Sequence, residues 1–217
     1  MDSKAVKLID MILKCEGYYV CDPLDNGGET YRGISRAANP NWDGWKIVDA
    51  HKPLKKNQKI NDPKLEENVR QFYYKYYYSP AKIDKLDDLL ASGHTFSMAV
   101  NAGVRNGAKL LQKAINKVYN VKIAVDGVIG QETLKYANGG KSREVGLEMI
   151  NQGNEYYEAI VRKKPSQKKF LNGWKNRVND VTKTCTENTV NVLYTISDKK
   201  GSWLEKLLFF IFSLLKK

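Results

Sequence analysis

The chain has 217 residues, of which 42% are hydrophobic and 28% are charged. This length suits one substantial hydrophobic core and leaves too little chain for two independent domains of ordinary size. The composition excludes collagen-like, low-complexity and intrinsically disordered classes. We therefore expect one main folded body.

The charge is strongly positive, because 36 Lys and Arg residues stand against 24 Asp and Glu residues and give a formal net charge of +12. Such a balance favours a polyanionic partner such as nucleic acid, anionic lipid or an anionic cell wall. The excess is scattered lysine, in segments such as KKNQK and RKKPSQKK. The sequence carries no signature of a nucleic-acid-binding module, so we expect no nucleic-acid partner.

The Cys and His content disfavours metal and disulfide chemistry. The three cysteines form no Cys-x-x-Cys pair, and the two histidines, His51 and His94, lie far apart in the chain. We expect neither a zinc site nor a disulfide framework, and the sequence implies no organic cofactor.

In chain order, the apolar residues of 3–16 recur at helical spacing, and Gly17 follows as a stop signal. Residues 18–49 are dense in Gly, Asn, Asp and Pro, which predicts a small hairpin or loop lobe. Helical patterns then return at 63–78, 96–119 (two patches, with Gly103 and Gly107 marking a break between them), from Gln131 onward, 144–161 and 170–185. The architecture is therefore predicted to be mainly α.

Glu16 stands where the first helical pattern ends. Ile9, Ile12 and Glu16 are spaced i, i+3, i+7, so the carboxylate lies on or beside the buried face. Desolvation and the negative end of the helix dipole both favour its neutral form, and a neutral carboxylic acid can protonate the leaving oxygen of a glycosidic bond. Alternatively, Glu16 merely ends the helix and reaches water.

Further acidic residues follow in the polar lobe. Asp22 and Asp25 are candidates for the second carboxylate that glycosidic cleavage uses, although each also suits a turn.

The stretch EGYYVCDPLDNGGETYRGIS, residues 16–35, resembles the opening motif of glycoside hydrolase family 108, the N-acetylmuramidases also known as secretion-activator proteins. The resemblance places Glu16 on the catalytic glutamate of that family. It continues through YYKYYYSPAKIDKL, FSMAVNAGVRNGAKLLQKAIN, VDGVIGQETL and FLNGWKNRV, whose later parts are similar to the companion peptidoglycan-binding region. The sequence departs from the family pattern at Tyr18, Cys21, Ser35 and Ser97.

The resemblance implies a mainly α, lysozyme-like helical fold with a small loop or hairpin lobe after the first helix. It divides the chain into a catalytic region at 1–92, a helical peptidoglycan-binding region at 93–184 packed in the same body, and a tail at 185–217. In the wider lysozyme-like group an Asp follows the glutamate by nine positions and a Thr by fifteen. In this sequence Asp25 occupies the first of these two positions, and Tyr31, with Thr30 beside it, occupies the second.

Substrate contacts are predicted in and near the lobe, because aromatic rings pack on sugar faces and polar side chains bind hydroxyl groups. The candidates are Tyr19, Thr30, Tyr31 and Asn101, of which Asn101 also suits a helix cap.

The implied function is an N-acetylmuramidase that cleaves the β-1,4 bond between N-acetylmuramic acid and N-acetylglucosamine in peptidoglycan glycan strands, with Glu16 as general acid and without a metal or cofactor. A lytic transglycosylase acting on the same bond and a catalytically decayed wall-binding protein remain alternatives. The wall or the periplasm would be the place of action.

The two ends of the chain bear on how the protein would reach the wall. The N-terminal segment MDSKAVKLIDMILKCEG has no signal-peptide pattern, which predicts synthesis in the cytoplasm and access through a holin or a secretion apparatus. The apolar run at 207–215 is shorter than a membrane span of roughly 20 residues. It suits a helix at a membrane surface, or one that docks on the core or a partner.

Overall fold

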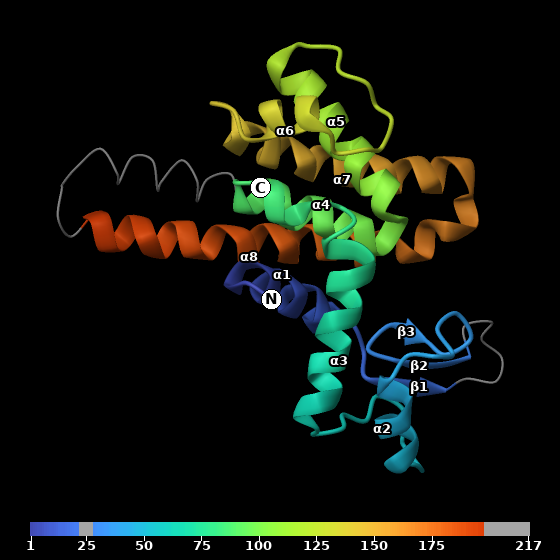
Figure 1. Ribbon diagram of the computed structural model, residues 1–217. Helices are drawn as coiled ribbons and strands as arrows, with labels where there is room; N and C mark the ends of the chain where they lie inside the picture. Colours follow the sequence, from blue (N-terminus) through green and yellow to red (C-terminus); the bar gives the residue numbers. More distant parts are fainter. Residues whose placement is uncertain (22–27, 198–217) are drawn as a thin grey trace.

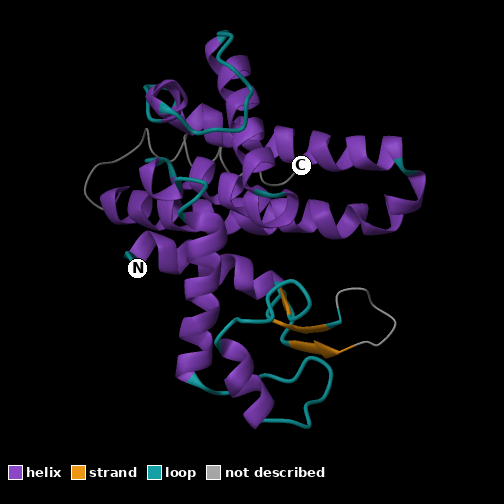
Figure 2. Ribbon diagram, turned by 45° about the vertical axis from the view of Figure 1, so that its right-hand side comes forward, coloured by secondary structure: helices purple, strands orange, loops and turns teal. Residues whose placement is uncertain are grey.

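The computed structural model describes residues 1–21 and 28–197, with side chains up to Thr186. Within these residues, eight α-helices surround a common core and one small antiparallel sheet projects to one side (Figure 1, Figure 2). The predicted mainly α, lysozyme-like fold is confirmed, and so is the small hairpin lobe after the first helix. The candidate carboxylates Asp22 and Asp25, and the apolar run at 207–215, lie outside the described residues.

Helix α1 (Ser3–Cys15) begins and ends where the sequence pattern predicts. The Asp2 carboxylate accepts a hydrogen bond from the Ala5 N–H at 2.7 Å and caps the first turn. Glu16 follows the helix with extended backbone angles (φ −93°, ψ 133°), so the chain leaves the helix axis at this residue. The apolar face of α1 is buried through Ala5, Leu8, Ile9, Met11, Ile12 and Leu13.

The lobe consists of β1 (Tyr19–Cys21), β2 (Glu29–Tyr31) and β3 (Ile34–Ser35) in the order β1-β2-β3, followed by α2 (Gly44–Ala50). Tyr31 lies opposite Tyr19 on one side and Ile34 on the other. Glu29 anchors the sheet, since its carboxylate pairs with Arg36 at 2.6 Å and with Lys52 at 2.8 Å. These contacts give Glu29 a structural role.

Helix α3 (Pro63–Tyr73) runs directly into one π-helical segment, η1 (Tyr74–Tyr78), as the continuous pattern at 63–78 predicts. Asp62 caps α3 by accepting from the Lys64 and Leu65 N–H groups at 2.8 Å and 2.9 Å. The wider π turn changes the direction of successive side chains, and both Tyr73 and Tyr78 are buried. A short 3₁₀ turn, η2 (Ile83–Lys85), leads on to the central helix.

Helix α4 (Leu89–Ala102) forms the centre of the helical body. It packs against α5 (Val104–Tyr119), α7 (Ser142–Lys163) and α8 (Leu171–Ser197), and also contacts α1. Its residues 90–99 are all buried. The predicted boundary between 92 and 93 falls inside α4, and that division of the chain stays a prediction.

The remaining elements are α6 (Gln131–Ala137) and the 3₁₀ segment η3 (Pro165–Phe170), which joins α7 to α8. The segment before α6 is a tight turn, in which Asp126 accepts from the Gln112 side chain at 2.8 Å and from the Val128 N–H at 2.9 Å. This side chain therefore holds the turn in shape.

The predicted break between the two helical patches is confirmed at Gly103, which has φ at +93° between α4 and α5. The assignment of Gly107 to this break is wrong, because this residue lies inside α5. A Cβ at Gly107 would approach the Thr95 carbonyl oxygen to 2.8 Å and the Ala99 nitrogen to 2.9 Å. Gly107 thus permits the close crossing of α4 and α5.

No helix in the described part of the chain combines the length and the apolar character needed to cross a membrane. The same residues contain no group of three or more His, Cys, Asp and Glu side chains arranged to hold a metal ion.

His94 makes the stability of the fold depend on pH. It is buried in α4, where its Nε2 pairs with the Thr182 hydroxyl at 3.0 Å, and burial lowers the pKa of His94 to about 3. The unfolded chain binds a proton at this residue below about pH 6.5, whereas the folded protein does not until about pH 3. The free energy of unfolding must therefore fall as the pH drops through this window.

We predict that His94 contributes about 2 kcal/mol to the loss of stability between pH 7.5 and pH 5. Urea unfolding of the wild type and His94→Gln at both pH values measures it. The variant is less stable at pH 7.5, but its stability falls less on acidification. An equal fall in both proteins would contradict the prediction.

Candidate active site

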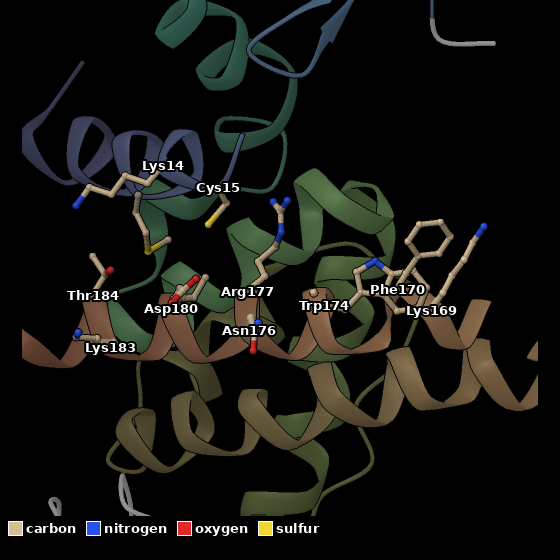
Figure 3. A pocket seen from close by; sticks show the side chains of 13 residues that line it. Lys14, Cys15, Lys169, Phe170, Trp174, Asn176, Arg177, Asp180, Lys183 and Thr184 are labelled. Carbon is tan, nitrogen blue, oxygen red and sulfur yellow. The ribbon is translucent and has the colours of Figure 1, made fainter. Parts of the chain in front are cut away.

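The carboxylate of Glu16 is paired with the guanidinium of Arg177. Glu16 Oε1 accepts a hydrogen bond from Arg177 Nη1 at 3.0 Å, and the two side chains are 19% and 18% exposed. Arg177 lies on α8, 161 residues further along the chain, and its side chain points from α8 towards the end of α1 (Figure 3). This ion pair links the end of α1 to α8, the first and the last helices in the described residues.

This pair alters the predicted electrostatics of Glu16. The sequence indicates only burial and the helix dipole, which both favour the neutral acid. Arg177 adds a cation within hydrogen-bonding distance, and a cation stabilises the carboxylate. The ion pair with Arg177 is therefore a feature of the site that the sequence pattern alone does not indicate.

The second oxygen of Glu16 lies against the turn between β2 and β3. A Cβ on Gly33 would be 2.8 Å from Glu16 Oε2 and 2.8 Å from the Tyr73 hydroxyl oxygen. Gly33 also has φ at +74°, which side chains rarely adopt. Only glycine at this position leaves room for both groups.

Two tyrosines from α3 and η1 complete this side of the site. The Tyr73 hydroxyl donates to the Arg32 carbonyl oxygen at 2.8 Å. Burial, with a smaller contribution from the negative charge of Glu16, raises the pKa of both Tyr73 and Tyr77. Both phenols therefore stay neutral at physiological pH.

Arg32 fixes the turn to the end of α1. Its Nη1 donates to the Leu13 carbonyl oxygen at 2.9 Å, and its Nη2 pairs with Glu66 at 3.3 Å. Its guanidinium also lies 4.1 Å from the centre of the Tyr18 ring. Arg32 thus binds a C-terminal carbonyl of α1 and holds Gly33 beside Glu16.

Tyr19 and Tyr31, two of the predicted substrate contacts, belong to the core of the lobe. Tyr31 is fully buried, and its hydroxyl accepts from the Ile60 N–H at 3.3 Å. Tyr19 is also buried and donates to Glu29 at 3.0 Å, and burial with this bond raises the pKa of Tyr19 to about 12. Neither ring is open to a sugar, so the structure gives both residues a packing role.

The other two predicted contacts have accessible side chains. Thr30 is partly exposed, because successive residues of β2 point to opposite faces and Tyr31 takes the core face. Asn101 is exposed near the end of α4. Both stay candidate substrate contacts.

The sequence analysis missed Gly33, Tyr73 and Arg177 as parts of the site. Tyr73 is one of several tyrosines in FYYKYYY, and Arg177 is one of many basic residues, so neither is distinguished by its type. Their segments do belong to the motifs of the family resemblance. Only the folded chain shows which member of each motif contacts Glu16.

A groove of about 720 Å³ lies beside the pair, between α1, η3 and α8 (Figure 3). Arg177 is part of its lining, together with Cys15 from α1 and Trp174 from α8. Glu16 is not part of the lining, so Arg177 lies between the groove and the carboxylate.

Comparison with known proteins assigns the two parts of the chain. Residues 9–103 match the family model of glycosyl hydrolase 108, and residues 106–179 match a predicted peptidoglycan domain. The chain thus carries a glycosyl hydrolase 108 region followed by a peptidoglycan domain. Glu16 lies in the first match and Arg177 in the second, so their ion pair joins the two family regions.

A solved structure, that of Brucella abortus SagA, superposes on this glycoside hydrolase with a TM-score of 0.59. The match covers 84% of this chain and 94% of that one at 22% sequence identity, which establishes a shared fold. A comparison with curated proteins found no match.

We predict that Gly33→Ala lowers the rate of peptidoglycan hydrolysis by one to two orders of magnitude, because its Cβ displaces Glu16 or Tyr73. Release of soluble fragments from purified peptidoglycan measures the rate. Gly28→Ala is the matched control, since Gly28 also has a positive φ (+58°) but no atom of the described residues lies within 4 Å of an added Cβ. A similar loss in both variants would show that backbone strain, and not contact with Glu16, is responsible.

Proposed function

We propose that this glycoside hydrolase is an N-acetylmuramidase that cleaves the β-1,4 bond between N-acetylmuramic acid and N-acetylglucosamine, with Glu16 as general acid. The observation that carries the proposal is the position of Glu16. It ends α1 four-fifths buried, beside Arg177, Gly33 and Tyr73, at the residue on which the catalytic glutamate of the family motif falls. The peptidoglycan domain supports peptidoglycan as the substrate.

Proton transfer from Glu16 fits this environment. Glycosidic cleavage needs a proton on the leaving oxygen, and Glu16 becomes a carboxylate when it gives that proton up. Arg177 lies 3.0 Å from Glu16 Oε1, where it stabilises the charge that forms.

The phenols of Tyr73 and Tyr77 remain neutral, so they place no further negative charge beside Glu16. Tyr73 is fixed by its bond to the Arg32 carbonyl, so it keeps the turn at Gly33 against the carboxylate. In this proposal the second carboxylate comes from Asp25 or Asp22.

Two alternatives act on the same polymer. A lytic transglycosylase would also use Glu16 as an acid but would leave an anhydro end on muramic acid. A decayed wall-binding protein would keep the peptidoglycan domain and have no activity. An active enzyme is favoured over a decayed one because Glu16 is paired with Arg177 and closely packed against Gly33; the chemical form of the product distinguishes the muramidase from the transglycosylase.

The proposal includes action at the cell wall or in the periplasm after synthesis in the cytoplasm. The net charge of +12 supports contact with an anionic wall. Access would need a holin or a secretion apparatus, and the C-terminal tail would supply any contact with a membrane surface.

We predict that Glu16→Gln lowers muramidase activity by at least about 100-fold, because glutamine has a similar shape but no acidic proton. Digestion of purified peptidoglycan, followed by mass spectrometry and reducing-end labelling, reads the products. Reducing muramic acid ends are expected from the wild type and from the control Glu132→Gln, which changes an exposed carboxylate on α6.

Three results would contradict this prediction in different ways. Anhydro ends would identify a transglycosylase. Equal activity of the wild type and Glu16→Gln would exclude Glu16 as the acid. Binding to the wall without any product would identify a decayed enzyme.

We predict that Arg177→Gln lowers kcat by about 100-fold, because the carboxylate that forms on Glu16 loses the cation that stabilises it. Release of soluble fragments from purified peptidoglycan at saturating substrate measures kcat. The control Arg162→Gln removes an exposed charge from the end of α7 and keeps the wild-type kcat. An unchanged kcat in Arg177→Gln would disprove a role for this ion pair in the reaction.

A further inference from the structure

The groove between α1, η3 and α8 is large enough to hold a ligand of its own. Its volume of about 720 Å³ lies within the roughly 300–1,000 Å³ of small-molecule sites. Figure 3 shows Lys14 and Cys15 on its α1 side and Trp174 and Arg177 on its α8 side. Lys169 and Phe170 of η3 stand at one end.

The charged side chains of the groove are mostly basic. Lys14, Lys169, Arg177 and Lys183 line it, against one carboxylate, that of Asp180. Lys14 and Lys169 are exposed and lie towards opposite ends of the groove (Figure 3), so they can bind separate negative charges of an elongated ligand. This arrangement favours a ligand with more than one negative charge.

The groove also offers apolar surface. Phe170 is 46% exposed, unusually for a large hydrophobic residue, and its ring lies 6.0 Å from that of Trp174. Trp174 is held in place by stacking on Tyr157, with ring centres 5.1 Å apart. Buried Met11 and Val181 supply apolar surface between α1 and α8. A ligand with small apolar groups beside its carboxylates would match this lining.

The groove adjoins the candidate active site at one residue. Arg177 lines the groove and also donates to Glu16 Oε1 at 3.0 Å. A muramic acid unit bound at Glu16 would therefore have its substituents within reach of the groove. In peptidoglycan that substituent is a short peptide that carries alanine methyl groups and free carboxylates.

We propose that the groove between α1, η3 and α8 binds the acidic peptide attached to muramic acid, so that the enzyme selects peptide-bearing glycan strands. This inference rests on the proposed function, since it places muramic acid at Glu16. Lys14 and Lys169 bind the peptide carboxylates, while Phe170 and Trp174 contact its apolar groups.

Two substrates test the proposal: glycan strands with their peptides intact, and the same strands after an amidase has removed the peptides. The wild type is expected to show a KM at least ten-fold lower on the intact strands. In Lys14→Ala/Lys169→Ala the ratio of the two KM values falls below about three. The control Lys46→Ala/Lys64→Ala removes the same charge from exposed positions on α2 and α3 and keeps the wild-type ratio.

Two outcomes would overturn the proposal. Equal KM values of the wild type on both substrates would show that the peptide is not recognised. An equal fall of the ratio in both double variants would assign the preference to overall charge and not to the groove.

Calorimetry with a soluble muramyl tetrapeptide separates failure of the groove from failure of the proposed function. A wild type that cleaves neither substrate overturns the muramidase assignment, and the groove is then judged by binding alone. Binding that weakens at least ten-fold in Lys14→Ala/Lys169→Ala, but not in the control, supports the groove. Absent binding, or equal binding in all three proteins, overturns it.

Discussion

The contact between Glu16 and Arg177 is the interaction on which the candidate site depends. A carboxylate that is four-fifths buried is costly unless a cation or hydrogen-bond donor faces it, and Arg177 is both. This contact requires α8 to lie against the end of α1. The position of α8 is set in turn by its packing on α4 and α7. The region that matches the peptidoglycan domain therefore contributes a residue, Arg177, that contacts Glu16 in the region that matches the hydrolase.

The turn at Gly33 supplies the opposite wall of the site. It is held by Arg32, which binds the Leu13 carbonyl, and by Tyr73, which binds the Arg32 carbonyl. Helix α1, the turn between β2 and β3, and α3 thus meet at one place through the polar contacts of Arg32. A packed arrangement of this kind leaves few alternative positions for the carboxylate of Glu16.

The positive charge of the chain acts both over the whole surface and locally, in the groove beside Glu16. A net charge of +12 favours approach to any polyanion, and by itself it does not distinguish one partner from another. In the groove beside Glu16, basic side chains stand next to exposed Phe170 and stacked Trp174. The combination of cations with apolar surface selects for amphipathic anions, which a uniformly basic surface would not do.

The sequence by itself determined the mainly α fold, the extent of α1, the lobe behind it and the position of Glu16 at their junction. These features depend on periodicity, caps and turn residues, which are local properties of the chain. Tertiary structure alone decided that Arg177 faces Glu16, that Tyr31 belongs to the core, and that Gly107 is a crossing point instead of a break. Each of these depends on which segments meet in space, and contacts between residues as distant as 16 and 177 leave no periodic trace in the sequence.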